Sequence, residues 1–309
     1  MRARLGRIAA WIGTAAALGW VFWKTPIRAV QAALAHANPW LIAAAMVGLL
    51  LVYAADSLAM WRAFWWFLAR LSFREVLIVR GASYLLAAIN YSVGQAAIVY
   101  FVHRTRGVPV MRGVATVLLI MGTNLLLLLM MVTGGLALGA TRITALPTIV
   151  GAAWIGLLFY IAVIAIRPRF LTARPLFDVL LSAGVTGHLK AVAVRVPHVA
   201  ALIIFQVTMF RAFHVAVPII EAVTLLPVVF FIAALPLSVQ GLGTTQAAMI
   251  LFFAHFAPGA PPDQKAAVVA ASLVGQALAL ALQATIGFVC LQTPVGRTLR
   301  NPRPAQASP

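Results

Sequence analysis

The sequence predicts an all-α polytopic membrane protein with about six spanning helices and two re-entrant hairpins in an inverted repeat. Composition is the first reason, because 63% of the 309 residues are hydrophobic and 9% are charged, whereas a soluble domain carries about 25% charged residues. The second reason is that the apolar residues form long runs, several of them near the roughly 20 residues that one crossing requires. The runs lie at 7–23, 39–60, 76–102, 113–138, 148–166, 197–220, 223–256 and 266–290.

The strong positive charge belongs to residues that flank these runs. The chain has 23 Lys and Arg against 5 Asp and Glu, a formal net charge of +18. A nucleic-acid-binding protein gathers its basic residues on one soluble surface, whereas here they stand in short islands between apolar runs, as membrane-flanking residues do. We therefore expect no nucleic-acid partner. The single cysteine, Cys290, rules out an intrachain disulfide.

The first two runs are expected to be spanning helices. Arginines at the start of the run at 7–23 resemble the start of a signal peptide, and "ALAHA" at 33–37 offers small residues for cleavage. That site lies about ten residues beyond the apolar run, so an uncleaved first helix is favoured. The segments at 61–75 and around 176–195 mix charged and apolar residues, and each predicts an amphipathic helix in the membrane interface.

Basic residues stand at both ends of the run at 76–102. Cytoplasmic loops are the ones enriched in Lys and Arg, so both ends of this run are expected on the cytoplasmic side. A spanning helix cannot begin and end on one side, whereas a re-entrant hairpin can, and the polar stretch "NYSVGQ" at 90–95 is its expected turn. The basic residues are Arg62, Arg70, Arg74 and Arg80 toward the start, and Arg104, Arg106 and Arg112 after the end.

The run at 223–256 is too long for one helix of about 20 residues. Its flanks, Glu221 before it and "APGAPPDQ" after it, carry almost no positive charge, so both ends are expected on the periplasmic side. Its middle, "LPLSVQGLGTTQ" at 235–246, holds residues that break helices or expose polar atoms. Irregular backbone at membrane depth is tolerated only where it is buried in protein or lines a wet cavity. The stretch therefore predicts the tip of a second re-entrant hairpin.

These assignments divide the chain into two repeats and a tail. Residues 1–140 form the first membrane repeat and 148–292 the second, each with two helices, a hairpin and a further helix, while 293–309 are expected to be a disordered cytoplasmic tail. Three crossings per repeat make the second repeat inverted, an architecture found in secondary transporters. Both termini are then cytoplasmic, as are most Lys and Arg. The exceptions are Lys24, Arg28, Arg142 and Lys265 outside, and Arg211 within the membrane.

Each hairpin tip is expected to start a new helix. Ser92 and Gln95 have the S-x-x-Q spacing of a capping box; at the second tip Gly243 or Thr244 can cap, with Gln246 in the first turn. A helix start offers unpaired N–H groups and a partial positive charge, which suit a phosphate or carboxylate. The alternative is that the tips cap themselves and pack against each other.

Further polar residues fall within or near the membrane. Asn124 lies about twelve residues into its helix, roughly 18 Å at 1.5 Å per residue, and Gln276 lies at a similar depth in the last helix. Arg211 is placed at membrane depth with His214 one turn away. An arginine there is either functional or a structural cation, held by hairpin carbonyls or snorkelling toward the interface. Asp56 lies near the cytoplasmic end of the second helix, where simple interfacial solvation is the plainest reading.

Enzyme signatures are missing from the sequence. No Gly-rich loop precedes a Lys as in a P-loop, and neither H-E-x-x-H nor G-x-S-x-G occurs. Five carboxylates in the whole chain leave little for acid–base chemistry, and the six His are scattered. We expect no enzymatic activity, no cofactor and no metal site.

Two stretches resemble the signatures of the flippase-like transmembrane region of lysylphosphatidylglycerol synthetases. They are "YLLAAINYSVGQAAIVYFVHRTRG" at 84–107 and "LPLSVQGLGTTQAA" at 235–248. The resemblance implies a stand-alone member without a synthetase domain, so aminoacyl transfer is not carried over. The chain departs from the family pattern at positions that usually carry charge or Pro. Val93 stands for a Pro, Gln95 for an Arg, Ala97 and Ile98 for Gly-Glu, and Gln246 for an acid.

The resemblance implies movement of a phospholipid or another amphipathic lipid across the cytoplasmic membrane. The alternative is a non-transporting accessory protein that holds an envelope-lipid or glycan-assembly enzyme at the membrane. The expected partners are accordingly a membrane lipid and, in the second case, such an enzyme. The residues expected to handle a lipid head group are Asn90, Ser92, Gly94, Gln95, Asn124, Arg211, Gly241, Gly243, Thr244, Gln246 and Gln276.

Overall fold

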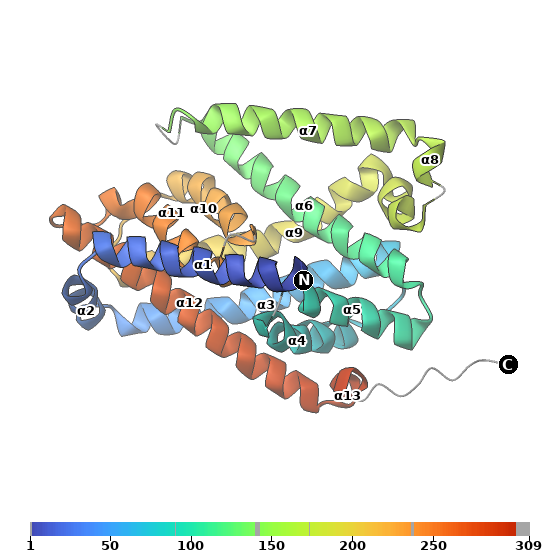
Figure 1. Ribbon diagram of the computed structural model, residues 1–309, viewed down its shortest axis with the longest axis horizontal. Coiled ribbons are helices and arrows are strands. Elements are labelled where there is room, and N and C mark those ends of the chain that lie inside the picture. The colour runs from blue at the N-terminus through green and yellow to red at the C-terminus, as the bar shows by residue number, and fades with distance from the viewer. Residues whose placement is uncertain (1, 90, 140–142, 173, 236–237, 301–309) are drawn as a thin grey trace. The chain divides into compact units, whose positions relative to one another are not determined.

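The computed structural model describes residues 2–89, 91–139, 143–172, 174–235 and 238–300, without the side chains at 2–10, 13, 24, 88, 89, 91, 92, 172, 175 and 298–300. Within these residues the chain is helical and has no strand, which confirms the predicted all-α polytopic class (Figure 1). The elements are α1 Arg2–Lys24, α2 Ile27–Ala35, α3 Pro39–Phe67, α4 Phe73–Ile89, α5 Tyr91–Arg106, α6 Val110–Ala137, α7 Leu146–Ile166, α8 Arg169–Thr172, α9 Pro175–Ala212, α10 Ile219–Ala234, η1 Val239–Gly241, α11 Thr244–Phe253, η2 Ala254–Phe256, α12 Pro261–Gln292 and α13 Pro294–Arg300.

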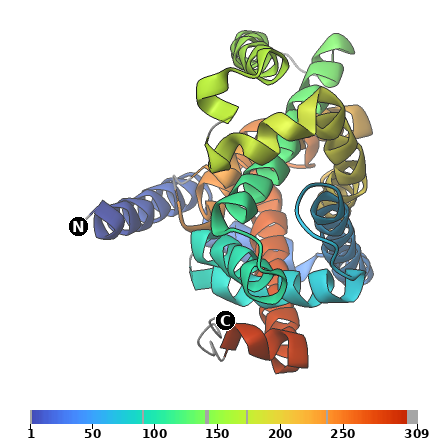
Figure 2. The ribbon, with the colours of Figure 1, turned by 90° about the vertical axis from the view of Figure 1, so that its right-hand side faces the viewer.

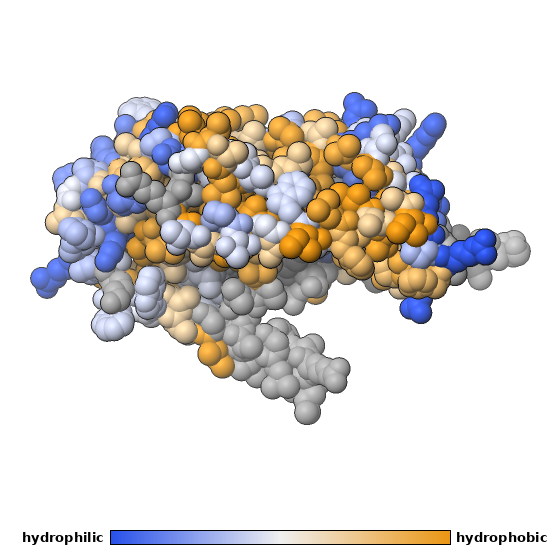
Figure 3. All heavy atoms as spheres, turned by 90° about the horizontal axis from the view of Figure 1, so that it is seen from above, coloured by the Kyte–Doolittle hydropathy of each residue, from blue (hydrophilic) through white to orange (hydrophobic). Residues whose placement is uncertain are grey.

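Five helices, namely α3, α6, α7, α9 and α12, are long and apolar enough to cross a membrane. They carry large apolar side chains that face outward, such as Ile155 and Phe159 on α7, each 72% exposed. Figure 3 shows broad areas of such side chains on the surface. Because water would oppose this exposure, the protein is an integral membrane protein. Thr14–Trp23 of α1 and Ile219–Ala234 are apolar but shorter, so a sixth crossing stays a prediction.

The chain forms two compact units, each built from parts of both sequence halves. The first unit is Met1–Leu50, Leu128–Pro147 and Ala200–Ala279, and the second is Leu51–Leu127, Thr148–Val199 and Leu280–Pro309. Each unit therefore takes one part of α3, α6, α9 and α12, and one pair of shorter helices. The helices also follow the same order in both halves of the sequence, as a repeat would require; its inverted orientation stays a prediction.

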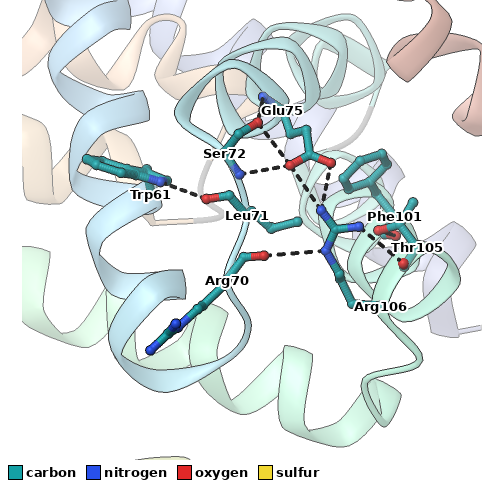
Figure 4. Close-up of polar contacts among 8 residues, drawn as sticks. All are labelled: Trp61, Arg70, Leu71, Ser72, Glu75, Phe101, Thr105 and Arg106. Atoms are coloured by element: carbon teal, nitrogen blue, oxygen red, sulfur yellow. Dashed lines mark hydrogen bonds and ion pairs between the residues drawn. The ribbon is translucent and has the colours of Figure 1, made fainter.

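In the second unit, α4 and α5 lie side by side as a helical hairpin (Figures 1 and 2). Gly94 permits the contact near the turn, because a Cβ built there would lie 2.6 Å from the Ala87 Cβ and 2.9 Å from the Ser83 carbonyl oxygen. At the other end, Arg106 Nη2 donates to both Glu75 oxygens, at 2.8 and 3.1 Å (Figure 4). The ends of the run at 76–102 thus meet, as in a chain that enters and turns back.

The prediction of a separate interfacial helix over 61–75 is wrong. Residues 61–67 finish α3, and α4 begins at Phe73. The reason is that Met60, Ala63 and Phe64 continue the buried face of α3, which packs on α4 and α5 in one apolar cluster. Trp61 closes the following turn by donating its indole N–H to the Leu71 carbonyl oxygen at 2.8 Å (Figure 4).

The first unit holds the shorter pair, α10 and α11, which contact each other. The turn between them runs through η1, and α1 packs against both η1 and α11. α10 ends at Ala234 and α11 begins at Thr244, so the helical break lies within the stretch at 235–246 that sequence identified.

α9 differs from its predicted form. The predicted interfacial segment around 176–195 and the first part of the run at 197–220 form one long helix, interrupted at Gly184, where φ is 59° and ψ is −177°. The helix stops at Ala212 rather than continuing to 220. It stops because the next residues turn: the Val215 N–H donates to the Phe210 carbonyl oxygen, and the Ala216 N–H donates to that of Phe256.

Candidate functional site

The second tip, residues 238–246, starts helix α11 with a glycine cap. Gly243 is the N-cap residue and has φ 86° and ψ −53°, a conformation that glycine adopts far more readily than other residues. Gln246, three residues on, accepts the Gly243 N–H through Oε1 at 2.6 Å. Of the two expected caps, Gly243 and Thr244, the structure has Gly243, and it confirms Gln246 in the first turn. A side-chain amide therefore occupies the position where an anion was expected to bind.

The other polar groups of the second tip also have partners within the first unit. Ser238 Oγ lies 2.8 Å from Thr244 Oγ1, which also donates to the Gly241 carbonyl oxygen at 3.1 Å. Gln246, whose side chain is fully buried, donates to Gln276 Oε1 at 2.9 Å. Gln276 in turn donates to the backbone carbonyl oxygen of Gln240 at 3.1 Å. The two glutamines thereby fasten the tip to α12.

Helix α1 covers this tip. The Val239 N–H donates to Thr14 Oγ1 at 2.7 Å. A Cβ built on Gly243 would lie 2.6 Å from the Ala17 Cβ and 2.8 Å from the Leu18 nitrogen. The structure thus brings five predicted site residues together, but it holds them in a tip that its own hydrogen bonds and α1 seal except at the exposed Gln240. The five are Gly241, Gly243, Thr244, Gln246 and Gln276.

The first tip is described only in part. Asn90 and the Ser92 side chain lie outside the described residues, so the predicted capping pair of Ser92 with Gln95 is not seen. Gly94 is buried at the contact with α4, and Gln95 is half-buried. Asn124, on α6, has a buried Oδ1 with no hydrogen-bond partner among the described residues.

The position of Arg211 along its helix differs from the prediction, because α9 ends at Ala212 and not at 220, whereas its placement at membrane depth stays a prediction. Arg211 lies in the last turn of α9, one residue before the helix ends, and it is exposed. A cation at a helix C-terminus is stabilised by the helix dipole, which gives Arg211 a structural reason for its position. Buried apolar residues such as Phe213 and Val215 lie in the turn that follows, and for that reason the turn looked like a continuation of the helix in the sequence.

The second unit contains a buried group of ionised side chains, the arginine cluster, made of Asp56, Arg80, Tyr84 and Arg195. Asp56 on α3 is 1% exposed. Its Oδ2 accepts Nε of Arg80 from α4 at 2.5 Å and the Tyr84 hydroxyl at 3.4 Å. Its Oδ1 accepts Nη1 of Arg195 from α9. One carboxylate thus joins three helices, and interfacial solvation of Asp56 is not what the structure shows.

The charges of this cluster do not cancel. Two guanidinium groups share one carboxylate, which leaves a formal charge of +1 at a place where the side chains of Arg80, Arg195 and Asp56 are 15%, 10% and 2% exposed. Within the described part of the chain, Nε of Arg195 is buried and has no hydrogen-bond partner. Burial of an incompletely compensated charge costs several kcal/mol. The cluster is therefore a place where one further anion would be stabilised.

Sequence reasoning missed this cluster because it counted Arg80 and Arg195 among the cytoplasmic flanking residues. A signal was present, since Arg80 stands inside the apolar stretch "VLIVRGASYLL" and Asp56 inside "LVYAADSLAM". Ionisable residues within membrane helices usually pair with one another and are functional candidates by default. The partner of Asp56 on α9 lies 139 residues away, a distance over which one sequence does not reveal pairing.

Comparisons with known proteins identify a family. The lysylphosphatidylglycerol synthase TM region matches residues 7–287. Searches among curated proteins and among solved structures gave no match. The matched range includes both helical hairpins and every residue of the arginine cluster. Because the match covers most of the chain, the protein belongs to the lysylphosphatidylglycerol synthase TM region family.

Proposed function

We propose that this protein moves a phospholipid or another amphipathic lipid across the cytoplasmic membrane. Membership of a family named for a lipid-linked membrane region associates the chain with lipid handling. A translocase must accommodate a polar or charged head group between its helices while the acyl chains stay in lipid. The proposal needs neither catalysis nor a cofactor.

The arginine cluster is the observation that carries this proposal. Its charges come from α3, α4 and α9, and two of these helices are long and apolar enough to span a membrane. Such charges are costly in a bilayer and mark substrate pathways in many transport proteins. Asp56 compensates only part of the positive charge, so the cluster offers attraction to an anionic group. The sealed second tip offers no comparable unpaired donor among its described residues.

Reconstituted liposomes test the proposal. Purified protein is incorporated into liposomes with fluorescent phospholipids of several head groups. A membrane-impermeant quencher is added outside, and the rate at which labelled lipid from the inner leaflet becomes quenched is measured. Wild type is expected to move lipid faster than empty liposomes, and Arg195→Gln is expected to lose most of that activity. Lys190→Gln is the matched control, because Lys190 lies on the same helix and is exposed. Wild type that moves none of the lipids above the rate of empty liposomes would remove the proposal.

A second candidate function is that of an accessory protein that holds an envelope-lipid or glycan-assembly enzyme at the membrane. The sealed second tip favours it, since a protein without transport tolerates a closed interior. Gln246 and Gln276 use their amides on the chain's own atoms. This candidate predicts no lipid movement in liposomes and co-purification with such an enzyme from native membranes. Lipid movement by purified protein alone would exclude it as the sole function.

A further inference from the structure

The arginine cluster has one unused donor in a confined position. Nε of Arg195 is buried and lacks a hydrogen-bond partner within the described residues. The whole residue is 8% exposed, so this N–H has little access to water. A buried charged group that lacks one of its hydrogen bonds is destabilising. Among the described residues, Asp56 forms the ion pairs with Arg80 and Arg195, and no second acid joins them. An acceptor from outside the chain would satisfy the donor.

We infer that the arginine cluster is a binding site for a phosphate group, with the phosphate of a lipid head group as its intended ligand. This inference rests on the proposed function, and it names the chemical class of group that the site takes. Arg195 supplies the unused N–H, and Arg80 supplies the second guanidinium group, whose side chain is slightly more exposed.

Phosphate fits this chemistry for two reasons. Guanidinium groups bind phosphate through parallel N–H donors, and such charge-assisted bonds are about twice as strong as neutral ones. A phosphodiester carries one negative charge, which equals the formal charge of +1 that Asp56 leaves on the two arginines.

The competing explanation is that the three charges only hold α3, α4 and α9 together. The two explanations differ in whether Asp56→Asn strengthens anion binding. In a phosphate site, the amide leaves two guanidinium groups without a counter-charge, so the anion binds more tightly. In a purely structural group, the same change only weakens the fold and gains nothing from anions.

The test is ligand binding to detergent-solubilised full-length protein, by native mass spectrometry and by the shift in thermal unfolding. The probes are dihexanoyl phosphatidylglycerol, inorganic phosphate and uncharged dihexanoylglycerol. Dihexanoyl phosphatidylglycerol is expected to bind at least tenfold more tightly than dihexanoylglycerol. Arg195→Gln is expected to weaken it at least tenfold, Asp56→Asn to strengthen it, and Lys190→Gln to leave it unchanged. If Arg195→Gln does not elute as a folded protein, Arg195→Lys replaces it. The loss of affinity is then expected to be smaller, because lysine keeps the positive charge but lacks the planar donors of the guanidinium group.

Each outcome decides the inference. Inorganic phosphate that binds as tightly as the lipid, with the same responses of the variants, supports the phosphate site and identifies free phosphate as a sufficient ligand. Binding that ignores Arg195→Gln, or that Asp56→Asn weakens, overturns the site. The liposome assay is independent of these readouts. Binding as expected without lipid movement would refute translocation and leave the phosphate site in place. Lipid movement together with binding that neither Arg195→Gln nor Asp56→Asn changes would refute the phosphate site and leave translocation in place.

Discussion

Substitution of Gly243 by alanine tests whether the second tip is sealed by close packing. Two costs add in the structure. Alanine at φ 86° and ψ −53° is strained by about 1–3 kcal/mol. Its Cβ would also lie 2.6 Å from the Ala17 Cβ and 2.8 Å from the Leu18 nitrogen; neither atom can rotate away, so α1 must shift, which costs about 1–3 kcal/mol. We expect Gly243→Ala to lower the free energy of unfolding by about 2–6 kcal/mol, the sum of these ranges.

The control is Gly122→Ala on α6, where a Cβ would have no heavy atom within 4 Å. This change removes a helix-weakening glycine and is expected to be neutral or stabilising by up to about 1 kcal/mol. Reversible unfolding in mixed micelles with increasing SDS gives the free energies. Hydrogen exchange at the Val239 amide, which donates to Thr14, reports whether α1 has moved from the tip. The packing account is refuted if Gly243→Ala unfolds with the same free energy as wild type and the Val239 amide stays protected.

Two further predictions concern the first hairpin. Single cysteines at Arg74 and Arg104, in a background without Cys290, are expected to react with a membrane-impermeant reagent from the same side; reaction from opposite sides would mean that 76–102 spans the membrane. Burial raises the pKa of Glu75, but hydrogen bonds from Ser72 and the Arg106 guanidinium outweigh burial and hold that pKa below its ordinary value of 4.5. Because the pKa of Glu75 is lower in the folded state, its stabilising effect is present above the ordinary pKa and is lost as pH falls through the folded pKa. Wild type is therefore expected to lose stability in acid. Glu75→Gln is expected to show a smaller pH dependence of the free energy of unfolding.

The positions of the helix breaks could be predicted because the signals are local. The polar residues at 90–95 and at 235–246 interrupt apolar runs, and the helices stop at Ile89 and Ala234. The cap at Gly243 was also predictable, since its partner Gln246 is only three residues away. A local rule of spacing and propensity is enough for such features.

The end of α9 and the course of the chain over 61–75 could not be predicted in the same way. The turn after Arg211 is lined by Phe213 and Val215, which are buried and apolar, so hydropathy does not separate the turn from the helix. Conversely, Trp61 and its neighbours look like an interfacial helix by composition, but Phe64 packs into the cluster with α4 and α5 and keeps the segment in α3. In both cases tertiary packing outweighs the local pattern.

The arginine cluster was beyond prediction for a different reason. Rules about flanking charge treat every Arg near the end of an apolar run as a membrane-flanking residue, and both Arg80 and Arg195 meet that description. What separates them from the flanking arginines is contact with Asp56 from another helix. Such contacts depend on the fold, and a single sequence does not contain them.

The division of the four long helices between the two units has a consequence for biosynthesis. Gly81 on α4 packs where a Cβ would lie 2.5 Å from Cys290 Sγ and 2.9 Å from Ile286, and Gly287 packs against Leu85. These partners on α12 leave the ribosome some two hundred residues after α4. Until then the inserted α4–α5 hairpin presents a face shaped for a helix that does not yet exist, and the second unit is complete only when α12 arrives. An assembly chaperone or an insertase that shields this face would thus act during most of translation, and the protein's two sequence halves would depend on each other from the moment of insertion.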